Sequence, residues 1–214
     1  MKLVSVNVGL PRDVMWRRQN VSTGIFKAPV SGRVAVRTLN LDGDGQADLT
    51  VHGGRFKAIY CYPGEHYAWW RGELDGRELE PAMFGENFTT DGLDEASVHI
   101  GDRFSIGSAQ VIVTQPRLPC YKLGIRFNAP AFVRQFLASG RTGFYLAVER
   151  EGDCGAGDPI TRVSADPEAV AIAAITRLYV AKTYEPDDRA LIRRTMRVAA
   201  FPDSWKAHFR ERLA

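Results

Sequence analysis

One segment of the sequence brings together residue types that could do chemistry. The run QPRLPCYKL carries Cys120 after two prolines, Pro116 and Pro119, whose rings fix φ and so restrict the approach to the cysteine. Arg117 and Lys122 can place positive charge near the thiol, which favours the thiolate. A thiolate is both a nucleophile and a ligand for soft metals. Cys120 is therefore a candidate catalytic residue and metal ligand, although a lone cysteine is more often a small buried residue.

The composition of the 214 residues limits the classes of function. Hydrophobic residues make up 45% and charged residues 25%, values that are typical of a soluble globular protein. The formal net charge of +3, without an isolated block of Lys and Arg, argues against nucleic-acid binding. No stretch approaches the roughly 20 apolar residues of a membrane helix, and the first apolar run is too short for a signal peptide. We expect a cytoplasmic protein that binds neither nucleic acid nor a membrane.

The other two cysteines have simpler explanations. Cys61 lies in the apolar run IYCY, where burial accounts for it, and Cys154 lies in a glycine-rich turn without an evident partner. The three cysteines form neither a CxxC pair nor a zinc-binding spacing, which indicates reduced thiols.

Short strands separated by glycine-rich turns dominate the chain up to residue 163. Two segments have helical spacing instead, at 64–74 and at 129–138, the second with Asn128 as its expected cap. Alternation and β-branched residues predict strands at 3–8, 21–26, 33–39, 58–62, 98–104, 110–114, 143–149 and 160–163. Many short strands with few helices indicate a mainly β barrel or sandwich.

The pattern changes near residue 165. Asp166 and Pro167 can start a helix, and an apolar stripe from Ile172 to Tyr179 continues it. Amphipathic spacing predicts two further helices at 187–198 and 202–213. We therefore expect a β domain at 1–164 and a small three-helix domain at 165–214, whose apolar faces make a homodimer reasonable.

The cysteine segment resembles the signature of the MOSC family, the domain shared with molybdenum-cofactor sulfurases. Other stretches resemble the same family in the same order, and the C-terminal helices resemble the three-helix domain of one bacterial subgroup. Relatives in that subgroup are linked to reduction of 6-N-hydroxylaminopurine and similar N-hydroxylated bases. The resemblance covers nearly the whole chain; its further stretches are GIFKAPVSGR, QADLTVHGG, YPGEHYAWW, FGENF and IGDRF.

The resemblance implies a fold, a cofactor and a reaction. The fold is a MOSC-type β-barrel with short helices and the appended three-helix domain. The cofactor is the molybdenum cofactor (molybdopterin) in a cleft, with the Cys120 thiolate as the protein ligand of molybdenum. The reaction converts an N–OH substrate into an amine. Because no flavin, haem or iron–sulfur motif is evident, the electrons should come from a separate reductase.

Several residues could bind the phosphate of the pterin. Lys27 and Arg33 flank a Pro–Gly turn that contains Ser31, and cations bind phosphate well. Both cations could equally be surface residues, and Ser31 a turn residue. Arg117 and Lys122 could also bind the cofactor in addition to acting on Cys120.

A loop with Asp48, His52 and two glycines, Gly53 and Gly54, is a second candidate for the site. Two glycines let the backbone approach a ligand closely, and His52 could transfer a proton during N–O cleavage. Asp48 could orient His52 or a cation. The alternative is a tight turn with His52 as a hydrogen-bonded support. Asn87, with a donor and an acceptor, could bind a pterin edge or serve as a turn residue.

Two other functions remain open at this point. The first is a carrier or binding module for the cofactor or for sulfur, without turnover. The second is a cofactor-free hydrolase with Cys120 as nucleophile and His52 as base. The hydrolase is the weaker hypothesis because nothing in the sequence places His52 within reach of Cys120.

Overall fold

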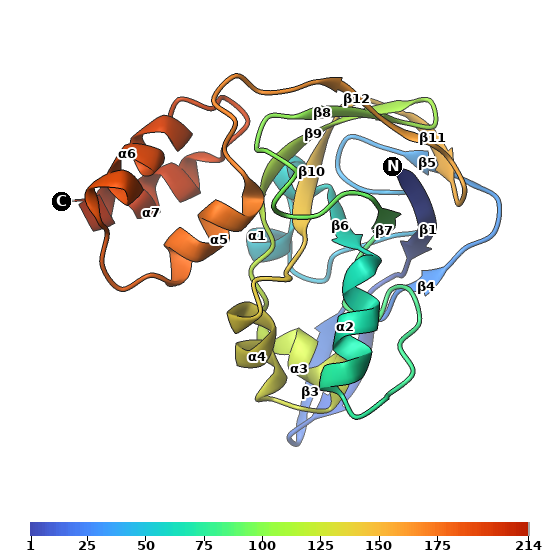
Figure 1. Ribbon diagram of the computed structural model, residues 1–214. Helices are drawn as coiled ribbons and strands as arrows, with labels where there is room; N and C mark the ends of the chain where they lie inside the picture. The colour runs from blue at the N-terminus through green and yellow to red at the C-terminus, as the bar shows by residue number, and fades with distance from the viewer. Residues whose placement is uncertain (214) are drawn as a thin grey trace.

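The computed structural model describes residues 1–213 and is rich in strands (Figure 1). Eight strands form one curved sheet: β1 (Lys2–Val8), β4 (Ala28–Pro29), β6 (Ile59–Pro63), β7 (Phe88–Asp91), β8 (Arg103–Ile106), β9 (Ala109–Pro116), β10 (Phe144–Arg150) and β12 (Ile160–Ser164). Their order is β12-β8-β9-β10-β6-β7-β1-β4, and every neighbouring pair is antiparallel except β6 and β7. Two small sheets complete the set, one from β5 (Arg33–Val36) and β11 (Gly152–Gly155), the other from β2 (Arg12–Trp16) and β3 (Gln19–Thr23).

The central strands explain why the sheet forms the core. All five residues of β6 are buried, and seven of the eight residues of β9 are buried. Strands that are covered on both faces lose the hydrophobic-polar alternation, which is why β6 (IYCYP) is apolar throughout and β9 contains the apolar run VIV. Pairing with β10, in which Phe144 lies opposite Pro116, fixes the end of β9, where the cysteine segment begins.

Short helices cover one end of the sheet. They are α1 (Leu49–His52), the 3-10 helix η1 (Arg55–Lys57), α2 (Glu65–Glu73), α3 (Tyr121–Phe127) and α4 (Phe132–Ala138). An aromatic cluster packs α2, α3 and α4 together, with the Trp70 and Phe132 ring centroids 5.0 Å apart and those of Phe127 and Phe132 4.0 Å apart. Packing rather than ligand binding therefore accounts for the aromatic residues of α2.

The three predicted C-terminal helices are present as α5 (Ile172–Val180), α6 (Pro186–Thr195) and α7 (Asp203–Leu213) (Figure 1). They share one hydrophobic core with the sheet, because Ile175, Leu178 and Phe209 belong to the same buried cluster as Val113 of β9. The Trp205 indole Nε1 also donates a hydrogen bond to Oε1 of Gln115 in β9. The helices are thus packed onto the sheet rather than appended at a distance.

Two elements begin later than the sequence predicted, because hydrogen bonds from the backbone to aspartate side chains form turns at their expected starts. The helix expected from Asp166 begins only at Ile172; the Asp166 carboxylate accepts from the Glu168 N–H at 3.0 Å and Ala169 has φ 46°. The strand expected at 98–104 begins at Arg103, since Asp102 accepts from the His99 N–H in a turn.

A hairpin was not predicted at all. The strands β2 and β3 pair across Arg17 and Arg18, whose φ values of 49° and 64° belong to a type of two-residue turn that usually takes Asn and Gly. The strand expected at 21–26 is therefore shifted to Gln19–Thr23. Asn128 caps the end of α3, with φ 51°, and not the start of α4.

No helix within residues 1–213 has both the length and the apolar composition that a membrane crossing requires.

Candidate functional site

A solvent-open pocket with about 580 Å³ of empty space gathers most of the residues singled out by the sequence. It lies where the end of β9, the start of α3, α1, η1 and the loops around residues 24 and 45 meet. Of the predicted site residues it brings together Lys27, His52, Asn87, Arg117, Cys120 and Lys122. It does not bring Ser31, Arg33, Asp48, Gly53 or Gly54 into its lining.

Cys120 occupies the N-cap of α3 and is half-buried. Burial alone would raise the pKa of its thiol, but a hydrogen bond from His52 and the charge of Arg117 oppose burial. The backbone N–H of Lys122 also favours the thiolate, and together these groups lower the pKa of Cys120 to about 7. Burial dominates at Cys61 and Cys154 and raises the pKa of each thiol to about 12. Cys120 is the one cysteine poised to act as a thiolate.

Among the cations that line the pocket and form no ion pair, Arg117 is the most deeply buried. Its side chain is 5% exposed and lies over the rings of Tyr60 and Phe136, at 5.2 and 5.5 Å from the ring centroids. Its Nη1 is buried without a hydrogen-bond partner among residues 1–213. An unmet charged donor in a pocket wall is costly, so this atom suits an anionic ligand.

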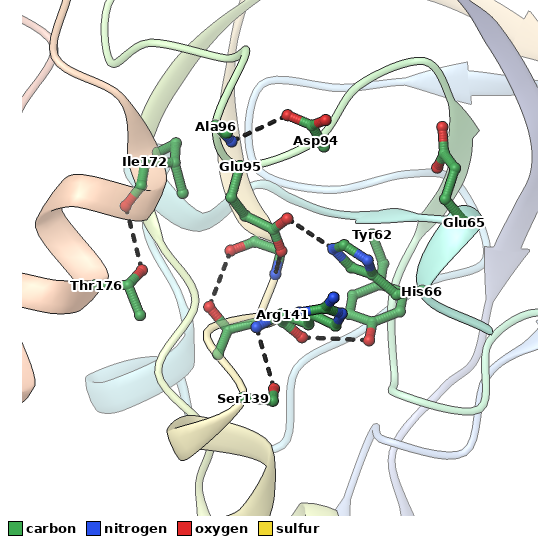
Figure 2. A network of polar contacts seen from close by, with 12 residues as sticks. Tyr62, Glu65, His66, Asp94, Glu95, Ala96, Ser139, Arg141, Ile172 and Thr176 are labelled. Atoms are coloured by element: carbon green, nitrogen blue, oxygen red, sulfur yellow. Dashed lines mark hydrogen bonds and ion pairs between the residues drawn. The ribbon is translucent and has the colours of Figure 1, made fainter. Parts of the chain in front are cut away.

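A polar network around Glu95, His66 and Tyr62 joins α2 to the start of β10 (Figure 2). The Arg117 N–H donates to the Gly143 carbonyl at 3.1 Å, and the Gly143 N–H donates to Oε1 of Glu95 at 2.7 Å. The other carboxylate oxygen of Glu95 binds Nε2 of His66 in α2 at 2.6 Å. Tyr62 adds a hydrogen bond from its hydroxyl to the Arg141 carbonyl at 3.2 Å. The network ties α2 and the start of β10 to the end of β9.

Lys27 and Asn87 line the pocket, but their polar groups are already engaged. Lys27 is buried and forms an ion pair with Asp44; burial lowers its pKa and Asp44 opposes that effect. The Asn87 Nδ2 donates to Asp44 at 2.9 Å and to the Asn7 carbonyl at 3.3 Å. Its Oδ1 accepts from the Tyr60 N–H at 3.0 Å. Both amide N–H groups of Asn87 are therefore taken, whereas the Lys27 ammonium has one protein partner, Asp44.

Asp48 and the two glycines build the loop that carries His52. Asp48 caps α1, accepting from the Thr50 N–H at 3.0 Å and from the Thr50 hydroxyl at 2.6 Å, which lowers its pKa. Its contact with His52 is through the backbone, where the His52 N–H donates to the Asp48 carbonyl at 2.9 Å. Gly54 has φ 89°, and a Cβ on Gly53 would lie 2.8 Å from the Leu49 carbonyl oxygen. The turn requires these glycines without any ligand.

Ser31 and Arg33 lie outside the pocket. Arg33 is exposed and binds Asp153 at 2.7 Å and Asp158 at 3.3 Å, and these hydrogen bonds raise its pKa. Ser31 is exposed in the turn that leads to β5. Their nearness to Lys27 in sequence suggested a shared phosphate site, but the pairing of β5 with β11 directs Arg33 to carboxylates instead.

The sequence analysis missed several residues of the pocket, among them Lys57, Tyr60 and Tyr145. The Lys57 Nζ donates to the Val51 carbonyl at 2.6 Å, and burial lowers the pKa of this amine. The buried Tyr60 hydroxyl donates to the Thr142 carbonyl at 2.8 Å. Tyr60 and Tyr145 come from paired strands whose apolar patterns gave no sign of a site.

The charge of the lining is positive, and the protein offers a metal few ligands. Lys57, Arg117 and Lys122 face one carboxylate, Asp44, which Lys27 already neutralises. Within the described chain, 1–213, no group of three His, Cys, Asp or Glu side chains could hold a metal ion. A metal at Cys120 would need its other ligands from a cofactor.

Comparison with known proteins identifies the family. The model of the MOSC domain matches residues 48–161, and that of the YiiM-like 3-alpha helix domain matches residues 173–214. This chain belongs to the MOSC family. Its MOSC segment contains both Cys120 and His52, and the helical match begins one residue after the start of α5.

Individual proteins are similar to this chain over nearly its whole length. The protein YflK of Bacillus subtilis (strain 168) is 37% identical over 207 residues, which cover 97% of this chain and 92% of that protein. A protein of Gibberella moniliformis described as a reductase is 31% identical over 66% of this chain and 26% of its own length. The crystal structure of YiiM from Geobacillus stearothermophilus superposes with a TM-score of 0.81 at 34% identity, covering 100% and 99% of the two chains.

Proposed function

We propose that this MOSC protein is a molybdenum-cofactor-dependent reductase of N-hydroxylated compounds such as 6-N-hydroxylaminopurine. The observation that carries the proposal is the half-buried Cys120 thiol, with a pKa of about 7, in a positively charged pocket. A thiolate in such a pocket suits a soft metal carried by an anionic cofactor. The reductase of Gibberella moniliformis supports an oxidoreductase at the level of the family.

The residues of the pocket fit the cofactor in chemical terms. Cys120 would be the protein ligand of molybdenum, and the unmet Nη1 donor of Arg117 would meet an anionic group of the cofactor. Lys57 and Lys122 add positive charge to the same wall. When bound, the cofactor supplies the two-electron redox chemistry that side chains lack.

The chain's own residues account for binding and proton supply. Reduction of one N–OH group to an amine consumes two electrons and two protons and releases one water. His52 lines the same pocket as Cys120, lowers the pKa of its thiol and is partly exposed, so it can deliver a proton at the pocket. We propose that a separate reductase supplies the electrons.

The test uses protein produced in a host that makes the cofactor. We expect near-stoichiometric molybdenum and pterin, and reduction of 6-N-hydroxylaminopurine in an assay coupled to an electron-donating reductase. Cys120→Ala should lose both metal and activity, whereas Cys154→Ala serves as the matched control. A Cys120→Ala protein that kept metal and activity would contradict the proposal.

Two alternatives are separated by the same measurements. A cofactor carrier would bind molybdenum without turnover. The placement of His52 and Cys120 in one pocket, where His52 lowers the pKa of the thiol, also favours a metal-free thiol hydrolase with His52 as the base. Near-stoichiometric molybdenum would exclude the hydrolase, and turnover in the coupled assay would exclude the carrier.

A further inference from the structure

A second group of cations gathers next to the pocket around the ring of Phe26. The Arg12 guanidinium of β2 lies 4.0 Å from the ring centroid of Phe26, and the Arg126 guanidinium of α3 lies 5.1 Å from it. A third guanidinium, that of Arg77, lies 5.3 Å from the ring of Phe127, the residue next to Arg126. We call Arg12, Arg77 and Arg126 the arginine cluster.

The arginine cluster lacks the counter-charges that other arginines have. Among residues 1–213 no carboxylate lies within ion-pair distance of its three guanidiniums, whereas Arg33, Arg103 and Arg197 all have such partners. The Nε of Arg126 is buried and has no hydrogen-bond partner in the described chain. Burial lowers the pKa of Arg126, and the positive charges of Arg12 and Arg77 lower it further. Like charges are thus held together without a carboxylate in ion-pair contact.

The arginine cluster lies next to the pocket of Cys120, although none of its three arginines lines that pocket. Lys122 and Arg126 lie four residues apart on α3, on the same face and about 6 Å apart along its axis. Ile25 and Lys27, on either side of Phe26, both line the pocket. Burial lowers the pKa of both Lys27 and Arg126, and the buried Glu86 carboxylate opposes that effect at each, so the two cations share one neighbourhood. A ligand that lies along α3 could reach both sites.

We propose that Arg12, Arg77 and Arg126 form a phosphate subsite that binds the phosphate of a nucleotide whose base enters the pocket beside Cys120. Guanidinium groups bind phosphate oxygens through paired N–H donors, and a dianion relieves the repulsion among three of them. The identity of the base rests on the function proposed above, and it makes the substrate an N-hydroxylated purine in nucleotide form. The phosphate itself could come from the nucleotide or be free in solution.

Binding to the full-length, cofactor-free protein tests the subsite without any need for molybdenum or turnover. Isothermal titration at fixed low ionic strength measures the Kd of adenosine 5′-monophosphate, adenosine and inorganic phosphate. We expect the monophosphate to bind about tenfold or more tightly than adenosine. Arg12→Gln and Arg126→Gln should reduce that ratio to less than about threefold. Arg134→Gln, which removes an exposed arginine of α4, is the matched control and should leave it unchanged.

The outcomes separate the two sources of phosphate. If inorganic phosphate bound as tightly as the monophosphate, a free ion would be the ligand and the nucleotide proposal would be overturned. Equal affinity for adenosine and its monophosphate would overturn it too, as would a ratio that survived both substitutions. Arg12 lies in the exposed hairpin, so Arg12→Gln remains informative if Arg126→Gln unfolds at a lower temperature. The affinities are measured without cofactor or turnover, so failure of the proposed reductase function would not change them.

Discussion

Cys120 owes its low pKa to neighbours that come from separate segments of the chain. His52 is the last residue of α1, and Arg117 directly follows β9. Lys122 contributes its backbone N–H from the first turn of α3. Burial opposes all three by disfavouring the charged thiolate. The balance leaves a thiol that ionises near neutral pH in a solvent-open pocket.

This balance predicts the pH dependence of alkylation in the cofactor-free protein. The folded pKa of about 7 lies below the ordinary value of 9.0, so the thiolate is present above pH 7 and is lost as the pH falls below it. Iodoacetamide should label Cys120 with a midpoint near pH 7, since Cys61 and Cys154 stay protonated there. His52→Ala should move the midpoint upward and slow labelling at pH 7 by roughly threefold to tenfold.

His99→Ala provides the control for that experiment, because His99 pairs with Asp102 away from the pocket. An unchanged midpoint in His52→Ala would mean that His52 does not stabilise the thiolate.

Asp44 is a second residue whose importance lies in its partners. It neutralises the buried Lys27 and accepts hydrogen bonds from Asn87 and from the Gly9 N–H at 3.0 Å. Asp44→Asn should lower the free energy of unfolding by about 3 kcal/mol or more, because an unpaired buried charge remains. Chemical denaturation measures the loss. Asp42→Asn, which breaks an exposed pair with Arg37, should leave the free energy of unfolding nearly unchanged.

At the scale of elements, β9 links the helical region to the pocket. Gln115 near its end accepts from the Trp205 indole of α7 and donates through Nε2 to the Phe56 carbonyl of η1 at 3.1 Å. The next residue of η1 is Lys57, which lines the pocket. One glutamine therefore connects α7, β9 and the short helix that forms part of the pocket wall.

Trp205→Phe tests this connection. The substitution keeps an aromatic ring in the core but leaves the buried Gln115 oxygen without its donor, so stability should fall by about 1–3 kcal/mol. Denaturant unfolding measures the change, and Trp16→Phe in β2 is the control because Trp16 is half-exposed. Equal stability of the two variants would show that the indole hydrogen bond contributes nothing.

The whole molecule has a common core for the sheet and the C-terminal helices. Ile172, Ile175 and Leu178 of α5 pack in the same buried cluster as Phe104 and Val111 of the sheet. The sequence predicted domains at 1–164 and 165–214. In the structure, one hydrophobic core contains residues from both segments.

A chain truncated after residue 164 should therefore be strongly destabilised. Its loss of buried apolar contacts should be comparable with the 5–15 kcal/mol by which domains are typically stable. Circular dichroism during heating, together with size-exclusion chromatography, should show an unfolded or aggregated product. Cooperative unfolding at the midpoint of the full chain would contradict this expectation.

The sequence alone determined the features that depend on local pattern. The proline-framed cysteine, the three C-terminal helices and most strands follow from residue types and periodicity within short windows. The hairpin at Arg17 and Arg18 escaped because those residues rarely adopt positive φ.

Only the tertiary structure decided which charges meet. The sequence offered both Arg33 and Arg117 as cofactor-binding candidates. In the structure, Arg33 pairs with Asp153 at the surface, whereas Arg117 is buried in the pocket of Cys120 with an unmet donor. Lys27 is likewise bound to Asp44. These pairings join segments far apart in the chain, and sheet register and long-range packing fix them, which no local pattern records.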